Sequence, residues 1–440
     1  RRVHGEVTMK PYLVLATILL LCHVVIAHRC GVQEAKGALK IFHGSSPCSP
    51  LGSRVSWERH VLHTQARDAT RAQTLTRLQA VNPGVPIASG RQILDTPLYI
   101  VFAQVGTPPQ TLLMSLDTAT DAAWIPCTGC TFCSSYIFNT SASSSFSPLA
   151  CDAIECSQAP NSECGSNNEC RFNEEFSGSV VFSNLVKDTV TLGADVLPSY
   201  TFGCVAKVIG VNVPPQGILG LGRGALSLLS QGRSSFKSTF SYCLPSILSF
   251  NFTGSLRLGR ENQPFKVRST PLLWNPRKPS LYYVKLAGIK YGGEVLNIPA
   301  SALQFSTVTG AGTVLDTATT YTRLVPEAYQ ALRDAFRARV GMGNDVVKRG
   351  SFDTCYSVPI NSPKITFMFS GFDLVLPPEN FLIQTAYGNV TCLAMVSAPA
   401  NADVAMNVIG SMQQQNYRVL IDVPRSRVGF SREDCSVPAF

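Results

Sequence analysis

Histidine is missing from most of this 440-residue chain, since all six histidines lie before residue 64. A domain formed by the later residues has no imidazole. That excludes Ser-His and Cys-His nucleophilic catalysis and every histidine-ligated metal site. Charged residues are also scarce, at 15%, whereas hydrophobic residues make up 45%. This balance excludes a disordered chain, which requires low hydrophobicity and high charge.

The chain also has few long apolar runs. The most prominent one lies near the N-terminus. It covers residues 13–26, follows Met9-Lys10 and ends in the small-residue sequence Val25-Ile26-Ala27. A transmembrane helix needs about 20 apolar residues, so this shorter run is typical of a secretory signal peptide. We expect a signal peptide at 9–27, with residues 1–8 as translated upstream sequence, and no membrane span.

The net charge of +9 is concentrated in the N-terminal part. Residues 1–91 carry 12 Lys/Arg and 4 Asp/Glu, whereas the remaining 349 residues carry 25 and 24. The larger part is nearly neutral, so nucleic-acid binding is not expected. Residues 28–91 are basic, with helical potential in 55–78. We expect them to form a pro-segment, and a mobile N-terminal arm is the alternative.

Cysteine is plentiful and even in number after the N-terminal part. An even count in a secreted chain indicates six disulfides, with a pairing that the sequence leaves open. We expect no zinc at the Cys-x-x-Cys-x-x-Cys run, no other metal and no cofactor. Seven of the twelve cysteines lie within residues 127–170, which predicts a long insertion held together by its own disulfide bonds. The twelve are Cys127, Cys130, Cys133, Cys151, Cys156, Cys164, Cys170, Cys204, Cys243, Cys355, Cys392 and Cys435. Three N-glycosylation sequons, at Asn139, Asn251 and Asn389, fit the same compartment.

From residue 97 onward the sequence has β character. Residues 99–105 alternate apolar and other side chains before the turn sequence Gly-Thr-Pro-Pro at 106–109. The clearest helix is predicted at Pro326–Val340, where apolar residues recur on one stripe and proline stands at the start. The glycines at 220, 222 and 224 lack the βαβ context of a nucleotide loop. We expect them to permit a close backbone crossing.

This β region repeats itself. Leu-Asp-Thr-Ala-Thr occurs at 116–120 and again at 315–319. Each copy follows apolar strands and precedes an apolar-apolar-glycine step, at 218–220 and 408–410. Coincidence does not account for an identical pentapeptide with concordant flanks. The repeat therefore predicts two homologous lobes, near 97–270 and 280–435.

The repeat brings a specific chemistry. If the lobes face each other, Asp117 and Asp316 meet, and two carboxylates in contact share one proton. The ionised member can take a proton from water, and the protonated member can donate to a carbonyl oxygen. That is general acid–base hydrolysis of a peptide bond without a metal or a histidine. Taken singly, each aspartate would be read as a turn cap at the end of a strand, but the duplication favours a catalytic pair.

These motifs resemble those of the pepsin-type aspartic proteases, and more narrowly the plant nepenthesin-like group. The resemblance covers about residues 85–435, including 100–109, 116–127, 217–224, 240–244, 314–324, 413–417 and 427–430. It implies a predominantly all-β, bilobal, pepsin-like double β-barrel with few short helices. It also implies a monomer that acts on polypeptide substrates, secreted to the apoplast or, alternatively, sent to the vacuole. The cysteine-rich stretch 127–170 resembles the insertion of this group.

The resemblance also implies roles for single residues. Asp117 and Asp316 would be the catalytic pair, and a β-hairpin flap would cover the cleft near Arg171–Lys187. The residues implied to support the pair are Thr118 and Thr317, interlocking between the lobes, and Thr120 and Thr319, bonding the outer carboxylate oxygens. The residues implied to line flap and subsites are Trp124, Phe176 and Tyr417.

The sequence departs from the family pattern in two places. Both copies read Asp-Thr-Ala, where the family has glycine third, and alanine fits only with negative φ and room for a methyl group. Phe176 falls where the family has tyrosine, so a hydroxyl that would bond Trp124 is lost. We therefore expect weaker or narrower activity.

Two functions remain open. The first is an acid endopeptidase made as a zymogen, whose basic pro-segment covers an acidic cleft until acid releases it. The second is a non-catalytic binder, resembling superfamily members that inhibit microbial xylanases.

Overall fold

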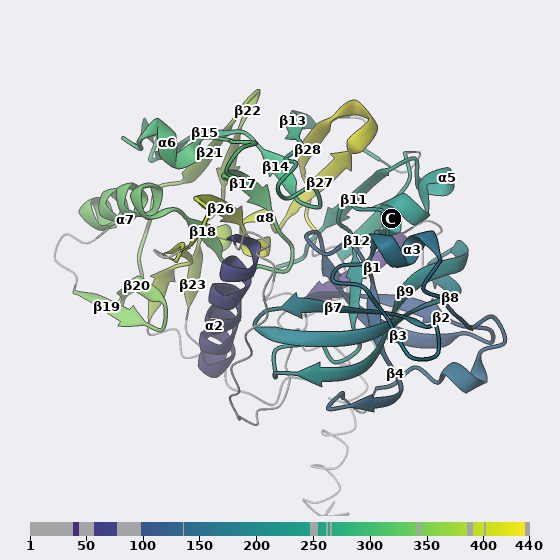
Figure 1. The fold of residues 1–440 in the computed structure, drawn as a ribbon. Helices are drawn as coiled ribbons and strands as arrows, with labels where there is room; N and C mark the ends of the chain where they lie inside the picture. The colour runs from purple at the N-terminus through teal and green to yellow at the C-terminus, as the bar shows by residue number, and fades with distance from the viewer. Residues whose placement is uncertain are drawn as a thin grey trace, which may run out of the picture.

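Two β-rich lobes form the molecule, with one long helix standing between them (Figure 1). The computed structural model describes residues 38–43, 57–76, 98–134, 136–246, 254–260, 263–264, 266–340, 345–384, 390–399 and 402–435. The predicted bilobal, predominantly β architecture is confirmed. The expected signal peptide and two of the sequons, Asn251 and Asn389, lie outside the described residues.

The N-terminal lobe is a sheet of mostly antiparallel strands wrapped around an apolar core. Its strands are β2 (Tyr99–Val105), β3 (Gln110–Asp117), β4 (Trp124–Thr131), β5 (Ser147–Pro148), β6 (Glu163–Cys164), β7 (Cys170–Phe176), β8 (Ser179–Leu192), β9 (Asp195–Ile209) and β10 (Ile218–Gly220). Its short helices are η1 (Thr140–Ala142), α3 (Ile154–Gln158), α4 (Leu228–Gln231) and α5 (Arg233–Phe236). The β2 boundaries coincide with the predicted alternating run.

The C-terminal lobe has three smaller groups of strands. They are β14 (Tyr282–Val284), β15 (Leu286–Tyr291), β16 (Glu294–Val295), β17 (Gly312–Leu315), β18 (Thr322–Leu324), β19 (Val346–Arg349), β20 (Phe352–Tyr356), β21 (Ile365–Phe369), β22 (Phe372–Leu376), β23 (Leu382–Gln384), β24 (Thr391–Leu393), β25 (Met395–Ser397) and β26 (Met406–Ile409). Its helices are α6 (Ala300–Leu303), α7 (Pro326–Val340), η2 (Pro378–Asn380), α8 (Ser411–Gln414) and η3 (Val423–Arg425). The helix predicted at Pro326–Val340 is confirmed, and its apolar stripe packs on the lobe.

A shared sheet joins the lobes. Its strand order is β1 (Ala38–His43), β12 (Gly254–Leu258), β11 (Thr239–Cys243), β27 (Tyr417–Asp422), β28 (Arg427–Arg432) and β13 (Arg268–Leu273). The β11–β27 pair links the two halves of the chain directly, with Ser241 opposite Leu420. This sheet fixes how the two repeats face each other.

The internal repeat has a structural counterpart. In the first copy, β3 runs parallel to β10 and Asp117 lies opposite Gly220. In the second copy, β17 runs parallel to β26 and Leu315 lies opposite Ile409. A Cβ atom at Gly220 would lie 2.2 Å from the carbonyl oxygen of Asp121, so the predicted close backbone crossing is confirmed.

The twelve cysteines from Cys127 onward form six disulfides. Three of these lie entirely within the insertion at 127–170, and two link segments more than 70 residues apart. The pairs are Cys127–Cys204, Cys130–Cys133, Cys151–Cys164, Cys156–Cys170, Cys243–Cys435 and Cys355–Cys392. The Cys-x-x-Cys-x-x-Cys run is thus used in two separate bridges.

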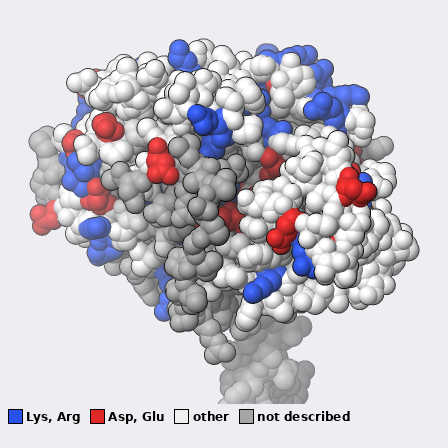
Figure 2. All heavy atoms as spheres, viewed as in Figure 1, with Lys and Arg blue, Asp and Glu red and all other residues white. Residues whose placement is uncertain are grey.

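The surface supports the charge analysis. In Figure 2, acidic and basic side chains are scattered over a face that is largely uncharged. Asn139 is exposed, and its side-chain oxygen accepts the N–H of Ser141. Among the described helices, none is long and apolar enough to cross a membrane.

Candidate active site

The ends of two equivalent strands place Asp117 and Asp316 at the junction of the lobes, and both side chains are fully buried. The residues after them interlock. The N–H of Thr118 donates to Oγ1 of Thr317 at 3.2 Å, and the N–H of Thr317 donates to Oγ1 of Thr118 at 3.1 Å. Each hydroxyl in turn donates to a carbonyl of the opposite lobe. These reciprocal bonds fix the two aspartate loops against each other.

Each carboxylate is held in the same way in its own loop. Oδ1 of Asp117 accepts the N–H of Ala119 at 2.7 Å, and Oδ2 accepts the hydroxyl of Thr120 at 2.9 Å. In the second copy, Oδ1 of Asp316 accepts the N–H of residue 318 at 3.0 Å, and Oδ2 accepts the hydroxyl of residue 319 at 2.7 Å. The arrangement is symmetric, as a pair of cooperating carboxyls requires.

The two alanines fit these loops. Neither Ala119 nor Ala318 is among the described residues with positive φ. Ala318 is fully buried and packs in a cluster with Trp124 and Phe176, while Ala119 packs against a cluster that contains Tyr283. Both conditions for replacing glycine are therefore met, and the methyl groups fill apolar contacts between the lobes.

The proximity of the two carboxyls has an electrostatic effect. Burial raises the pKa of Asp117, the nearby guanidinium of Arg71 lowers it, and the negative charge of Asp316 raises it again, so the pKa of Asp117 stays above its ordinary value. Two carboxyls that influence each other in this way can hold one proton between them. Such a pair can act as general base and general acid at once.

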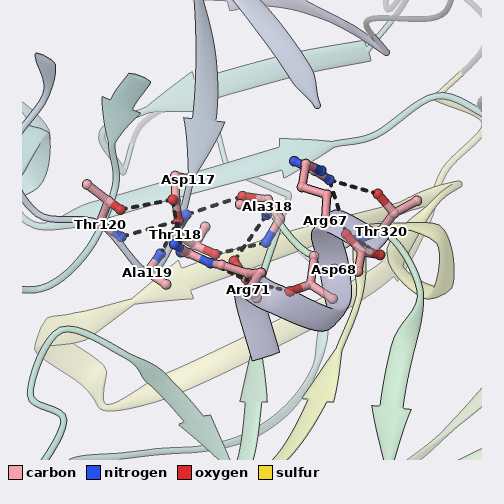
Figure 3. A network of polar contacts seen from close by, with 12 residues as sticks. Arg67, Asp68, Arg71, Asp117, Thr118, Ala119, Thr120, Ala318 and Thr320 are labelled. Atoms are coloured by element: carbon pink, nitrogen blue, oxygen red, sulfur yellow. Dashed lines mark hydrogen bonds and ion pairs between the residues drawn. The ribbon is translucent and has the colours of Figure 1, made fainter. Parts of the chain in front are cut away.

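A helix from the N-terminal segment occupies the space in front of the pair. This helix, α2 (Trp57–Thr76), lies within the segment of predicted helical potential. Arg71 extends from it, and Nη2 donates to both carboxylate oxygens of Asp117, at 2.8 and 2.9 Å. Nε lies 3.5 Å from Oδ2 of Asp316. Figure 3 shows the guanidinium lying against the aspartate loop. Arg71 is 3% exposed, and it lies over the ring of Phe176 at 5.3 Å from the centroid.

One turn earlier, α2 makes a second polar contact with the C-terminal lobe. Asp68 is fully buried and accepts the backbone N–H groups of Thr320 and Tyr321, at 2.8 Å each. Nη2 of Arg67 donates to Oδ1 of Asp68 at 3.1 Å and to Oγ1 of Thr320 at 3.2 Å. Figure 3 shows Arg67, Asp68 and Thr320 beside the Arg71 contact. The basic character of this segment is evident from the sequence, but none of these individual contacts is.

The expected flap is the hairpin of β7 and β8. Its turn residues Ser177 and Gly178 both have positive φ, at 50° and 79°, which matches the tight turns typical of β-hairpins. Phe176 at its tip packs edge-to-face on Trp124, with ring centroids 6.0 Å apart. Nε1 of Trp124 is buried without a hydrogen-bond partner among the described residues. This is the lost bond that the phenylalanine led us to expect.

Tyr417 does not belong to this site. It lies in β27 of the shared sheet, its ring is part of the main apolar core, and its hydroxyl donates to the carbonyl oxygen of Val375 at 2.5 Å. Motif position alone suggested a subsite role, but strand register turns this ring toward β22. The structure thus brings Asp117, Asp316, Trp124 and Phe176 together and leaves Tyr417 apart.

A third carboxyl near the pair escaped the sequence analysis. Glu174 lies on β7, a strand of the expected flap, and its Oε2 is buried without a hydrogen-bond partner in the described part of the chain. Burial, with the nearby carboxyls of Asp117 and Asp121, raises the pKa of Glu174 to about 8, although Arg71 acts in the opposite direction. The only sequence signal is an acidic residue two positions before the flap aromatic.

Glu174→Gln is expected to change how stability depends on pH. An unfolded glutamate has a pKa of about 4.3, so between that pH and about 8 the folded protein binds more protons. The free energy of unfolding therefore falls as pH rises through this window, by up to about 1.4 kcal/mol per pH unit. Glutamine cannot ionise, so the stability advantage of the variant should grow from pH 5 to 8. Thermal unfolding, with the exposed Glu294→Gln as control, measures it. A constant difference would contradict the shifted pKa.

The chain is similar to several known proteins. Two family profiles match the chain, "Xylanase inhibitor N-terminal" over residues 99–260 and "Xylanase inhibitor C-terminal" over residues 281–432. The chain is 45% identical to Aspartyl protease AED3 of Arabidopsis thaliana over 403 residues, covering 89% of each chain. It is 41% identical to Aspartyl protease 25 of Oryza sativa subsp. japonica, covering 90% of this chain and 93% of that protein. It is 34% identical to Aspartic proteinase nepenthesin-1 of Nepenthes gracilis, covering 77% and 78%.

The fold is shared with solved structures of lower identity. The crystal structure of basic 7S globulin from soybean matches with a TM-score of 0.62 and 22% identity, covering 77% of this chain and 94% of that one. Conglutin gamma from lupine seeds matches with a TM-score of 0.63 and 22% identity, covering 77% and 93%. These two likenesses concern the fold alone.

Proposed function

Because the chain belongs to the plant aspartyl protease family, we propose that it is an aspartic-type endopeptidase made as a latent precursor. The observation that carries the proposal is the symmetric pair Asp117 and Asp316, bridged by Arg71 from the N-terminal segment. A fold that had lost catalysis would have no need to keep both carboxyls and to cover them with a matched cation.

The proposed chemistry uses only groups of this chain and a water molecule. Once Arg71 has left, a water can lie between the carboxyls. The ionised member takes its proton as the water oxygen attacks the peptide carbonyl, and the protonated member donates to the carbonyl oxygen. The N–H and hydroxyl donors of both loops keep the carboxylates in position throughout. Proton transfer to the departing nitrogen then completes hydrolysis.

The proposal extends to the life of the precursor. Residues 9–27 would direct secretion to the apoplast or, alternatively, transport to the vacuole. Residues 28–91 would be the pro-segment, and α2 its inhibitory element. The remaining two-lobed chain would act as a monomer on polypeptide substrates, which lie extended beneath the β7–β8 flap.

Hydrolysis by acid-treated protein tests the proposal. Full-length chain exposed to about pH 4 should cleave an apolar quenched-fluorescence peptide with a bell-shaped dependence over about pH 3–6, as expected for a pair that shares a proton. Pepstatin should inhibit it. No hydrolysis by folded protein that has lost α2 would overturn the proposal.

A second candidate function is a non-catalytic binder. The unsatisfied Nε1 of Trp124 favours it, as does the inhibitor description of the matching family profiles. A binder would hold its partner equally well with either aspartate replaced. The two functions therefore differ in their response to substitution at the pair.

Phe176→Tyr is expected to raise the activity of the processed protein. A tyrosine hydroxyl would supply an acceptor for the buried Nε1 of Trp124, whose lack of a partner costs about 1–3 kcal/mol. A better fixed flap should increase kcat/KM by about 3- to 10-fold. Phe182→Tyr, an exposed aromatic on the same hairpin, is the control. Equal effects of the two substitutions would show that the Trp124 bond does not limit the flap.

A further inference from the structure

The contact of Asp68 reveals a set of hydrogen-bond donors on the side of the C-terminal lobe that packs against α2. The N–H groups of Thr320 and Tyr321 converge on Oδ2 of Asp68 at 2.8 Å each. They directly follow Thr319, whose hydroxyl holds Asp316. A carboxylate is thus already seated within a few residues of the catalytic loop.

Arg323 adds a positive charge to this place. It lies in β18, is 3% exposed, and donates from Nη2 to the carbonyl oxygen of Gln65 at 3.0 Å. Its Nε is buried without a hydrogen-bond partner among the described residues. Burial raises the pKa of Asp68, and the positive charges of Arg67 and Arg323 lower it, so the guanidinium is close enough to act on this carboxyl. The hydrogen-bond acceptor of Arg323 and the carboxyl on which its charge acts therefore both belong to α2.

Departure of α2 would expose these donors to water until a bound substrate covers them again. A buried N–H without a partner is costly, and a buried guanidinium without an anion is more so. A peptide carbonyl can accept the N–H groups of Thr320 and Tyr321, but it leaves Arg323 unneutralised. A carboxylate satisfies both needs, since charge-assisted hydrogen bonds are stronger than neutral ones.

We propose that in the mature protein Arg323 and the N–H groups of Thr320 and Tyr321 form a subsite for an acidic substrate side chain, the place that Asp68 holds in the precursor. This inference rests on the proposed peptidase function. Asp68 lies three residues from Arg71, which is about 4.5 Å along a helix, and an extended peptide advances about 3.3 Å per residue. The acidic side chain would therefore stand within about three residues of the scissile bond.

A peptide scan tests this subsite. One cleavable apolar peptide carries glutamate at each position in turn, up to four residues on either side of the scissile bond, and is compared with its glutamine counterpart at about pH 5. The glutamate is ionised at this pH. At one position, wild-type protein should prefer glutamate by about 10- to 100-fold in kcat/KM, mainly through a lower KM. Equal cleavage of every pair would overturn the subsite.

Variants identify the residue responsible. Arg323→Gln should reduce the glutamate-to-glutamine ratio to about one, whereas Arg323→Lys, which keeps the charge, should retain part of it. Arg268→Gln, an exposed arginine of β13, is the matched control and should keep the full ratio. A preference that persists unchanged in Arg323→Gln would place acidic recognition elsewhere and contradict the proposal.

A binding measurement separates this inference from the peptidase proposal. Synthetic peptide 57–76 and its Asp68→Asn form are titrated onto protein freed of residues 28–91. Wild-type protein should bind the asparagine form about 10- to 100-fold more weakly, and Arg323→Gln should bind the two forms alike. This titration tests the subsite even if the protein cleaves no peptide. Absence of cleavage would count against the peptidase function but not against the subsite. Equal binding of both peptides by wild-type protein would refute the carboxylate subsite.

Discussion

Arg71→Ala is expected to abolish the latency of the precursor. Its guanidinium makes two hydrogen bonds to Asp117 and an ion pair with Asp316, in a position that is 3% exposed. Removing one partner of a buried charge pair costs about 3–5 kcal/mol. Most of this cost would destabilise the state in which α2 is docked. The undocked population should therefore rise by at least about 100-fold.

The measurement is the rate at which full-length chain loses its pro-segment at about pH 6.5, followed by mass spectrometry. Arg71→Ala should be processed at least about 100-fold faster than wild type. Arg268→Ala replaces an exposed arginine of β13 and should behave as wild type. Arg71→Lys keeps the charge but cannot contact Asp117 and Asp316 through two separate nitrogen atoms, so an intermediate rate is expected. If all four chains were processed alike, Arg71 would not be the element that keeps the precursor latent.

Acid acts on the two polar contacts of α2 in opposite directions. Burial raises the pKa of Asp117 and Arg71 lowers it. Loss of the Arg71 charge lets this carboxyl take up a proton, so through that contact acid favours release, whereas loss of the burial that α2 provides acts the other way. Burial raises the pKa of Asp68, so undocking gives up a proton and acid favours docking there. Acid release of α2 therefore depends on the Arg71 contact outweighing that of Asp68.

Asp117→Asn and Asp316→Asn are the substitutions with the second largest expected effect. Asparagine can still accept the N–H of the alanine two residues on, but it cannot share or transfer the proton. General acid–base catalysis contributes about 10²–10⁴-fold, so kcat should fall by at least about 10²-fold in either variant. Peptide hydrolysis by the processed variants measures this, with thermal unfolding to show that the fold is retained. Residual activity near the wild-type level would exclude the pair as the catalytic groups.

The same two variants should differ in the precursor. Arg71 makes its two hydrogen bonds to Asp117 and only the longer contact, at 3.5 Å, to Asp316. Asp117→Asn should therefore loosen α2 more than Asp316→Asn. An added protease, which cleaves α2 only when it is undocked, reports the difference. Equal protection of the two variants would contradict the asymmetry of the Arg71 contact.

The architecture could be predicted from the sequence because its signals are local and repeated. An identical pentapeptide placed Asp117 and Asp316 in equivalent positions, and a stripe of apolar residues after a proline defined α7 to the residue. Turn sequences and alternation defined β2. Such patterns reflect backbone geometry that each segment adopts largely by itself.

The contacts of α2 could not be predicted because they depend on how a distant segment docks between the lobes. Arg67, Asp68 and Arg71 occupy one turn of a helix that is otherwise unremarkable in sequence. Their partners lie more than 40 residues away in the chain. The subsite role predicted for Tyr417 was wrong for a related reason. A motif indicates a strand, but the register of the sheet decides to which side each ring points. Disulfide pairing is likewise a property of the folded chain.

The central claim is that a competent pair of aspartates is held inactive by Arg71. A single time course tests it most directly. Full-length chain is shifted from pH 7 to pH 4, and release of the pro-segment is followed together with cleavage of a quenched-fluorescence peptide. The account predicts that peptidase activity rises in step with loss of α2 and that Asp117→Asn gains none. Complete release of α2 from folded wild-type protein without any activity would contradict it.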